Sequence, residues 1–217
     1  MRGNVAVGVA APLRETLAAA LVLLSGYRGR DPFCDPFCGS GTIPIEAALI
    51  AKNRAPGLNR RCSAQKWTWL PSRVWVDGAG EAMDLEYHGN YEIWGGDIDP
   101  AAVQIARENA EKAEVEEIVR FSLADARAFS RKEPYGRIVS NPPYGERLME
   151  KREAEGLYRD FGRAVQGLPT GWRINLLSSH TEFERTFGRT ADKKRKLYNG
   201  MIKCDLFQYH GKKKSAT

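Results

Sequence analysis

The sequence lacks any apolar run long enough to span a membrane. Its longest apolar stretch, residues 17–24, is far shorter than the roughly 20 residues that a spanning helix needs, and Ser25 and Gly26 follow it. Residues 1–11 also lack the apolar core of a secretory signal. We therefore expect a cytoplasmic protein that has no association with membranes.

Cysteine is sparse, and its spacing matches no common metal or redox motif. The four cysteines, Cys34, Cys38, Cys62 and Cys204, include no C-x-x-C pair, which is the spacing typical of zinc sites and redox motifs. We expect reduced thiols with a packing role and no metal site. Internal repeats are also missing. The 217 residues, 42% of them hydrophobic, indicate one ordinary globular domain.

Positive charge is in modest excess over negative charge. The chain has 33 lysine and arginine residues against 27 aspartate and glutamate residues, a net charge of +6. This balance favours a polyanionic partner, although solvated surfaces commonly carry such an excess.

The stretch 35–46, DPFCGSGTIPIE, predicts a strand, a glycine turn and a helix. We expect the strand over 32–37 and the helix over 45–51, with Thr42 as its cap and Pro44 in its first turn. A helix that starts after a strand and a glycine turn forms a site for a polar or anionic ligand. The turn lacks the lysine of a P-loop and the third glycine of a dinucleotide fingerprint, so it indicates only a nucleotide-like ligand.

Strands and helices alternate along most of the chain. We expect further strands at 91–97, 118–123, 137–140 and 173–178, and helices at 17–24, 101–113 and 155–165. A final hairpin is expected around Asn199-Gly200, between strands 196–198 and 201–207. This order predicts an α/β fold with a mostly parallel, doubly wound sheet and an antiparallel hairpin at its end. In such sheets, ligands bind at the carboxyl ends of the strands.

Acidic residues follow two of the expected strands. Asp97 suits a ribose, because one carboxylate can accept from both hydroxyls, whereas Asp99 before Pro100 fits a helix cap. Asp125 either accepts from the exocyclic amine of a base or caps the next helix.

The segment 141–144, Asn-Pro-Pro-Tyr, indicates the reaction. Prolines have no N–H, so the amide oxygen of Asn141 and the carbonyl oxygen of Pro142 can both accept from one NH2 group of a nucleobase. Tyr144 could stack on that base. An amine held in this way could attack a sulfonium methyl group without a metal or a strong base. The alternative is a plain turn between strand and helix.

The segment 53–89 interleaves basic residues with Trp67, Trp69 and Trp75. One interpretation is that the tryptophans fill a small core under an insertion. The other is a basic and aromatic surface for nucleic acid, with Arg54, Arg60 and Arg61 on phosphates.

Several stretches carry a family resemblance: APLRETLAAAL, DPFCGSGT, GGDIDP, NPPYGERL, GLYRDFG and KLYNGMIKC. From residue 11 to 209 the chain resembles S-adenosylmethionine-dependent methyltransferases, and more narrowly the THUMP-associated RNA guanine-N2 methyltransferases, a UPF0020-like family. The resemblance implies a seven-stranded Rossmann-like class I sheet. We expect a tail at 1–10, a methyltransferase domain at 11–211 with an insertion at 53–90, and a basic tail at 212–217.

The resemblance also implies roles for single residues. The cofactor would be S-adenosyl-L-methionine, with its methionine part on Asp35, Phe37, Cys38, Gly39, Ser40 and Gly41, its ribose on Asp97, and its adenine against Ile98 and Asp125. Thr42 and Asn141 complete the expected cofactor set. The target base would lie on Asn141, Pro142, Pro143 and Tyr144, and structured RNA, ribosomal or transfer, on Arg54, Arg60, Arg61 and Arg147.

Family members usually carry a ferredoxin-like and THUMP region that captures RNA, and this sequence has no counterpart of it. We expect an excised or truncated catalytic domain rather than a lone one. Adenine-N6 methylation of DNA is the main alternative, because those enzymes share the Asn-Pro-Pro-Tyr pattern. A dinucleotide oxidoreductase and a non-catalytic RNA-binding module fit the residues less well.

Overall fold

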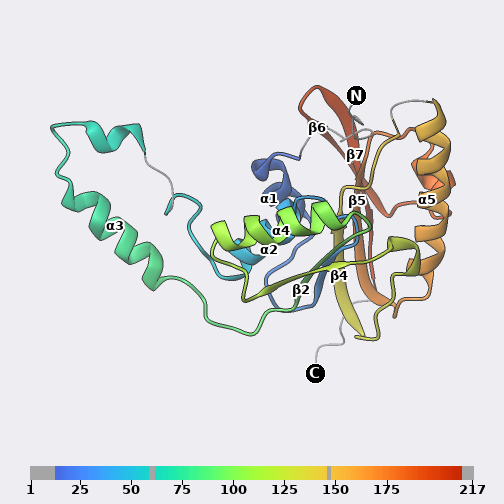
Figure 1. The fold of residues 1–217 in the computed structure, drawn as a ribbon, viewed down its shortest axis with the longest axis horizontal. Coiled ribbons are helices and arrows are strands. Elements are labelled where there is room, and N and C mark those ends of the chain that lie inside the picture. Colours follow the sequence, from blue (N-terminus) through green and yellow to red (C-terminus); the bar gives the residue numbers. More distant parts are fainter. Residues whose placement is uncertain (1–12, 59–61, 146–147, 212–217) are drawn as a thin grey trace, which may run out of the picture.

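The computed structural model describes residues 13–58, 62–145 and 148–211, and these form one seven-stranded sheet in the order β3-β2-β1-β4-β5-β7-β6 (Figure 1). The strands are β1 (Phe33–Asp35), β2 (Ile93–Asp97), β3 (Val119–Leu123), β4 (Tyr135–Ser140), β5 (Gly171–Ser178), β6 (Lys193–Asn199) and β7 (Ile202–Tyr209). The first five are parallel, and β7 is antiparallel to both β5 and β6. The predicted fold class is confirmed.

Helices cover both faces of the sheet. On one side lie α1 (Glu15–Leu24), α2 (Thr42–Ala51) and α4 (Pro100–Lys112), and on the other lies α5 (Leu148–Gln166) (Figure 1). The short helix α6 (Phe183–Phe187) shares the core of α5. Each face has its own apolar core. Leu21, Ala47 and Ala106 belong to the first, and Phe161 and Phe183 to the second. Within the described ranges, no helix has both the length and the apolar character to cross a membrane.

The glycine turn after β1 differs from the prediction in its details. The strand is shorter than expected, and α2 already begins at Thr42, so Thr42 is not its cap. The cap position belongs to Gly41, which has a left-handed φ of 84° and no side chain. A Cβ atom there would lie 2.8 Å from Cζ of Phe121. Glycine is required both by this backbone conformation and by the close packing.

The hairpin also differs by one residue from the prediction. Asn199 is the last residue of β6 and pairs with Ile202, so the turn consists of Gly200 and Met201. The first strand of the hairpin is longer than expected, because Lys193, Lys194 and Arg195 continue it.

The insertion between α2 and β2 projects from the body of the protein (Figure 1). It contains a short 3-10 turn, η1 (Ser63–Lys66), and α3 (Arg73–Asp84), in which no described residue is buried. Trp67 and Trp69 stack on each other with ring centroids 5.4 Å apart, yet they are 51% and 72% exposed. The interpretation of these two tryptophans as the filling of a small core is therefore wrong.

Candidate active site

A cleft of about 650 Å³ lies at the carboxyl ends of the parallel strands. It opens beside the point where the strand order reverses, between β1 and β4, which is where doubly wound sheets bind their ligands. Most of the expected cofactor residues line it: Asp35, Phe37, Cys38, Gly39, Ser40, Thr42, Asp97, Ile98, Asp125 and Asn141. Pro143 lines it as well.

The glycine turn forms one wall of the cleft and is fixed to β2. The carboxylate of Asp97 accepts from the backbone N–H of Gly39 at 2.9 Å, and the N–H of Cys38 donates to the carbonyl of Gly96 at 2.9 Å. Asn109 of α4 donates to the carbonyl of Ser40 at 3.0 Å. These bonds fix the turn to β2 and α4.

Asp35, the last residue of β1, is almost fully buried, with 1% of its surface exposed. Its Oδ1 accepts from the N–H of Phe37 at 3.1 Å and from the hydroxyl of Ser140 at the end of β4. Its Oδ2 is buried and has no hydrogen-bond partner among the described residues. Burial raises the pKa of Asp35 from 3.8 to about 7. A cation in the cleft would stabilise the ionised form.

Asp97 and Asp99 make different contacts, and the helix cap predicted at Asp99 is confirmed. Asp99 caps α4 by accepting from the N–H of Ala101 at 2.8 Å. Asp97 accepts one bond on each oxygen, from Gly39 and from the N–H of Asp99 at 3.0 Å. A carboxylate oxygen can accept further bonds, so Asp97 keeps acceptor capacity toward the cleft. Ile98 beside it is 65% exposed.

Asp125 serves as a cap in this structure. It accepts from the N–H of Arg127 at 2.9 Å at the start of η2 (Ala126–Ala128), and the Arg127 guanidinium pairs with the same carboxylate. These bonds from Arg127 lower the pKa of Asp125. Both side chains line the cleft, so the cap and a ligand contact are compatible.

The acceptor segment follows β4. Asn141 faces the cleft, and its Oδ1 accepts from the hydroxyl of Tyr144 at 2.5 Å. The Tyr144 ring is only 3% exposed, and the Cys204 thiol of β7 donates to its hydroxyl at 3.6 Å. Burial raises the pKa of Tyr144. In this conformation the ring is not available to stack on a base; it orients Asn141 instead.

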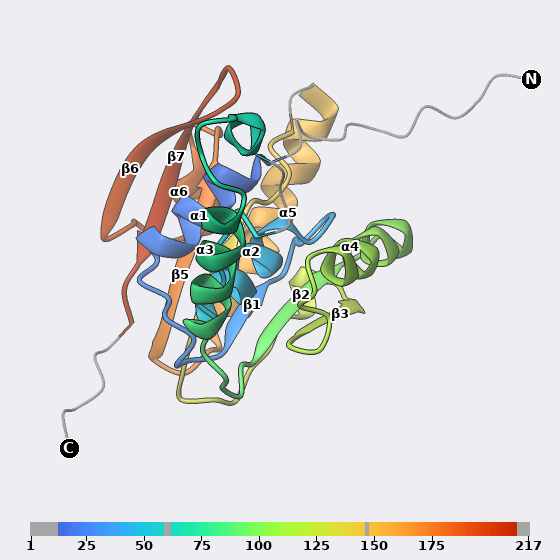
Figure 2. The ribbon, with the colours of Figure 1, turned by 90° about the vertical axis from the view of Figure 1, so that its left-hand side faces the viewer.

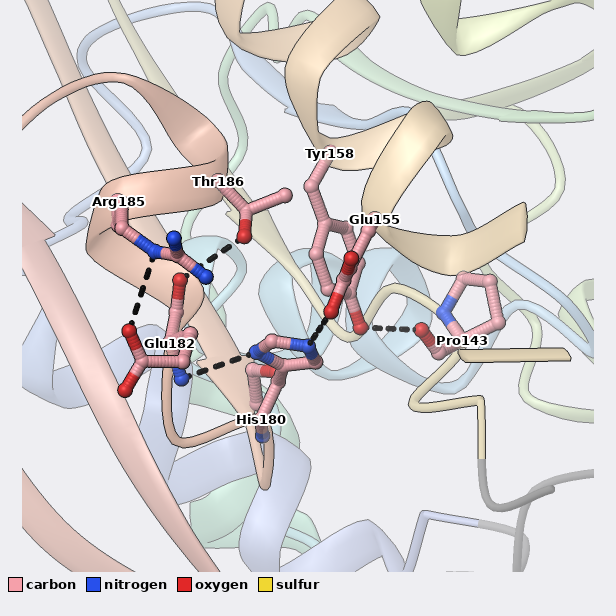
Figure 3. Close-up of polar contacts among 8 residues, drawn as sticks. Pro143, Glu155, Tyr158, His180, Glu182, Arg185 and Thr186 are labelled. Carbon is pink, nitrogen blue, oxygen red and sulfur yellow. Dashed lines mark hydrogen bonds and ion pairs between the residues drawn. The ribbon is translucent and has the colours of Figure 1, made fainter. Parts of the chain in front are cut away.

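Pro143 is held by a side chain of α5 (Figure 3). The buried Tyr158 of α5 donates its hydroxyl hydrogen to the Pro143 carbonyl, and burial raises the pKa of Tyr158 to about 12. Its ring packs edge-on against His180, with centroids 5.8 Å apart. Nδ1 of His180 accepts from the N–H of Glu182 at 3.1 Å, so Nε2 carries the hydrogen that is shared with Glu155 at 3.0 Å.

Several expected site residues lie elsewhere. Gly41, Pro142 and Tyr144 are not part of the cleft wall. Arg54 is 11% exposed and pairs with Glu86 and Glu114, so its side chain stabilises the base of the insertion and is not presented to RNA. Arg60, Arg61 and Arg147 lie outside the described residues, as do the tails at 1–10 and 212–217.

The cleft also contains residues that the motifs did not indicate. Leu13, just before α1, and Leu157 of α5 both line the cleft. The apolar pattern of these helices shows that they pack but does not show which side chain reaches the cleft.

Comparison with known proteins finds clear relatives. Residues 2–208 match the UPF0020 family, described as an RMKL-like methyltransferase domain. The chain is 46% identical over 206 residues to "Putative RNA methyltransferase YpsC" of Bacillus subtilis, a match that covers 93% of the chain and 52% of YpsC.

Two solved structures are also similar. SMU.472, described as "a putative methyltransferase complexed with SAH", is 40% identical with a TM-score of 0.90, covering 95% of this chain and 55% of that one. A Listeria monocytogenes protein, described as a predicted N6-adenine-specific DNA methylase, is 44% identical with a TM-score of 0.88, covering 96% and 53%. The chain thus spans about half the length of these relatives.

Proposed function

The chain belongs to the UPF0020 family of RMKL-like methyltransferase domains, and from that membership we propose that it methylates the N2 amine of guanine in structured RNA, ribosomal or transfer. Its methyl donor is S-adenosyl-L-methionine, the parent of the S-adenosyl-L-homocysteine (SAH) bound in a relative. When bound, this cofactor supplies an electrophilic methyl group on a sulfonium sulfur.

The residues of the cleft fit this cofactor. The observation that carries the proposal is the buried Oδ2 of Asp35, which has no hydrogen-bond partner in the described part of the chain, because the cofactor brings the cationic groups that such a carboxylate lacks. In our assignment the turn from Phe37 to Ser40 holds the methionine part. Asp97 accepts from the ribose hydroxyls, and the exposed Ile98 packs on the adenine ring.

The acceptor half of the site lies next to it. Asn141 follows β4, whose last residue, Ser140, is hydrogen-bonded to Asp35. A carbonyl oxygen has two lone pairs, so Asn141 Oδ1 can accept from a base amine while Tyr144 fixes its direction. With the cofactor held by the glycine turn and Asp97, this amine nitrogen would face the sulfonium methyl group, SAH would be the leaving group, and the amine proton would go to solvent. Asn141 contributes by alignment.

The assignment of guanine N2 as the methylated atom depends on the family resemblance of the motifs. The second candidate is N6 of adenine in DNA, because the Listeria relative is described as a predicted N6-adenine-specific DNA methylase. Both reactions use the same Asn-Pro-Pro-Tyr chemistry. The identity of the RNA also remains part of the proposal, since the chain spans about half the length of its relatives.

Nucleoside analysis separates the two candidates. Purified protein is incubated with methyl-labelled cofactor and, in parallel, with rRNA, tRNA and DNA, and the digested products are separated. We expect N2-methylguanosine from RNA, and a loss on the order of 10²-fold in rate for Asn141→Ala with cofactor binding retained. Label in N6-methyladenine of DNA would refute the RNA assignment, and unchanged activity of Asn141→Ala would refute the site.

A further inference from the structure

We propose that the edge strand β6, with the adjoining start of β7, binds the phosphate backbone of the RNA and leads it to the acceptor site. The inference rests on the proposed function, because it supplies that site with its substrate. The family resemblance includes residues 196–204 of this hairpin but implies no role for them, and the acceptor motif lies elsewhere in the sequence.

The charge of β6 is concentrated at one place in the sequence. Lys193, Lys194, Arg195 and Lys196 follow one another, and all four are exposed. The strand lies at the outer edge of the sheet, beyond β7 (Figure 2). Successive side chains of a strand point to opposite faces, so the positive groups surround this edge on both sides.

Most of this charge is not neutralised within the described residues. Lys194 pairs with Glu184 of α6 at 2.7 Å. Lys196 lies opposite Asp205 in the register of the hairpin without forming an ion pair with it. Lys193 and Arg195 lie opposite the uncharged Gln208 and Leu206, and neither has an ion pair in the described part of the chain. Lysine and arginine side chains in this state are suited to phosphates.

The strand runs toward the acceptor segment. Its last residue, Asn199, is buried and hydrogen-bonds the Tyr144 hydroxyl, which also accepts from Cys204 on β7. The hairpin turn and the N-terminal end of α5 lie at the same end of the sheet in both views (Figures 1 and 2). A strand of 7 residues spans about 20 Å, so a bound RNA could follow β6 up to the cleft.

The hairpin tip adds groups of the right kind. Tyr198 and Met201 are 60% and 96% exposed, and the exposed Lys203 pairs with Tyr198 in the register. An exposed tyrosine next to lysines can stack on a base, which Tyr144 in its buried position does not do.

Charged edge strands have a second explanation, because lysines on an edge prevent pairing with other sheets. If the lysines only prevent such pairing, removing them should not weaken RNA binding more than removing the same charge elsewhere. A matched pair of variants separates the two explanations. The first is the triple variant Lys193→Gln, Arg195→Gln and Lys196→Gln. The control is Lys112→Gln, Arg120→Gln and Lys132→Gln, which removes the same charge from exposed residues near the amino ends of the strands.

The experiment measures binding of a fluorescently labelled RNA hairpin by anisotropy, between about 50 and 200 mM salt, without cofactor. We expect the β6 variant to bind about tenfold or more weakly, with the slope of log affinity against log salt shallower by about 2. The control variant should change affinity less than threefold or so. Both variants should bind SAH like the wild type, which shows that they are folded.

Equal weakening in the two variants would overturn the proposal, as would no weakening in the β6 variant or no binding by the wild type at the lowest salt. Tighter binding of a DNA hairpin of the same sequence would overturn the assignment to RNA. A loss of RNA affinity in the β6 variant alone supports the binding surface even if nucleoside analysis finds no N2-methylguanosine. The two experiments can therefore refute the surface and the reaction independently.

Discussion

At the scale of single residues, Asp35 lowers the stability of the fold when it is ionised, and it also has a proposed role in binding. Its pKa of about 7 means that the folded protein holds a proton between about pH 4 and 7 that the unfolded chain has lost. The contribution of Asp35 to stability therefore decreases as the pH rises through this range. A cationic ligand reverses the effect, because it stabilises the ionised carboxylate.

The variant Asp35→Asn tests this reasoning. Since it removes the ionisation, we expect its melting temperature relative to wild type to be about 3 °C or more higher at pH 8 than at pH 5. Wild-type affinity for the cofactor should rise from pH 6 to 8, whereas the variant should bind weakly at both. Melting curves and calorimetric titrations measure these effects. A difference in melting temperature between the two proteins that stays constant across pH would contradict the role of Asp35.

Tyr158 acts through Pro143, and we expect Tyr158→Phe to slow methyl transfer about threefold to tenfold with little change in cofactor affinity. The lost hydrogen bond costs about 1 kcal/mol and frees the acceptor segment.

Tyr209→Phe is the matched control for Tyr158→Phe, because Tyr209 is equally buried and donates to the backbone carbonyl of Arg189 at 3.3 Å, in contacts that do not include the cleft. Rates and affinities measured side by side decide the question. A similar loss of rate in both variants would mean that stability alone is responsible.

At the scale of elements, the glycine turn before α2 combines a backbone requirement with a packing requirement. Gly41→Ala should lower the melting temperature by about 5 °C or more, since a left-handed alanine is strained and its Cβ would lie 2.8 Å from Phe121. Gly39→Ala is the control, because Gly39 also has a positive φ of 50° but has open space around it. Thermal unfolding should show the smaller loss for Gly39→Ala; the reverse order would contradict the packing argument.

Local chemistry predicted the elements that depend on neighbouring residues. Asp99 before Pro100 predicted the cap of α4, and the alternation of strands and helices predicted the sheet. The cap was misassigned to Thr42 because Gly41 takes the cap position in a left-handed conformation and packs against Phe121, which lies far along the chain. Helix α3 was missed because Gly78 and Gly80 argue against a helix. The burial of Tyr144 depends on Cys204, 60 residues further on, which no local pattern shows.

At the scale of the whole molecule, the topology explains why a distributed set of residues forms one cleft. Asp35, Asp97 and Asn141 come from three strands that are neighbours in the sheet order, and parallel strands bring their carboxyl ends to one edge. The chain spans about half the length of its relatives, so selection of the substrate is a property to be tested on longer proteins as well.

The central claim is that this cleft binds S-adenosyl-L-methionine, and calorimetric titration with its product SAH tests it most directly. We predict a saturable heat with one site per chain, and a weaker affinity for Asp97→Asn. Titrations at two temperatures guard against an enthalpy near zero at one of them. Saturable binding would support the account; no saturable heat at either temperature would contradict it.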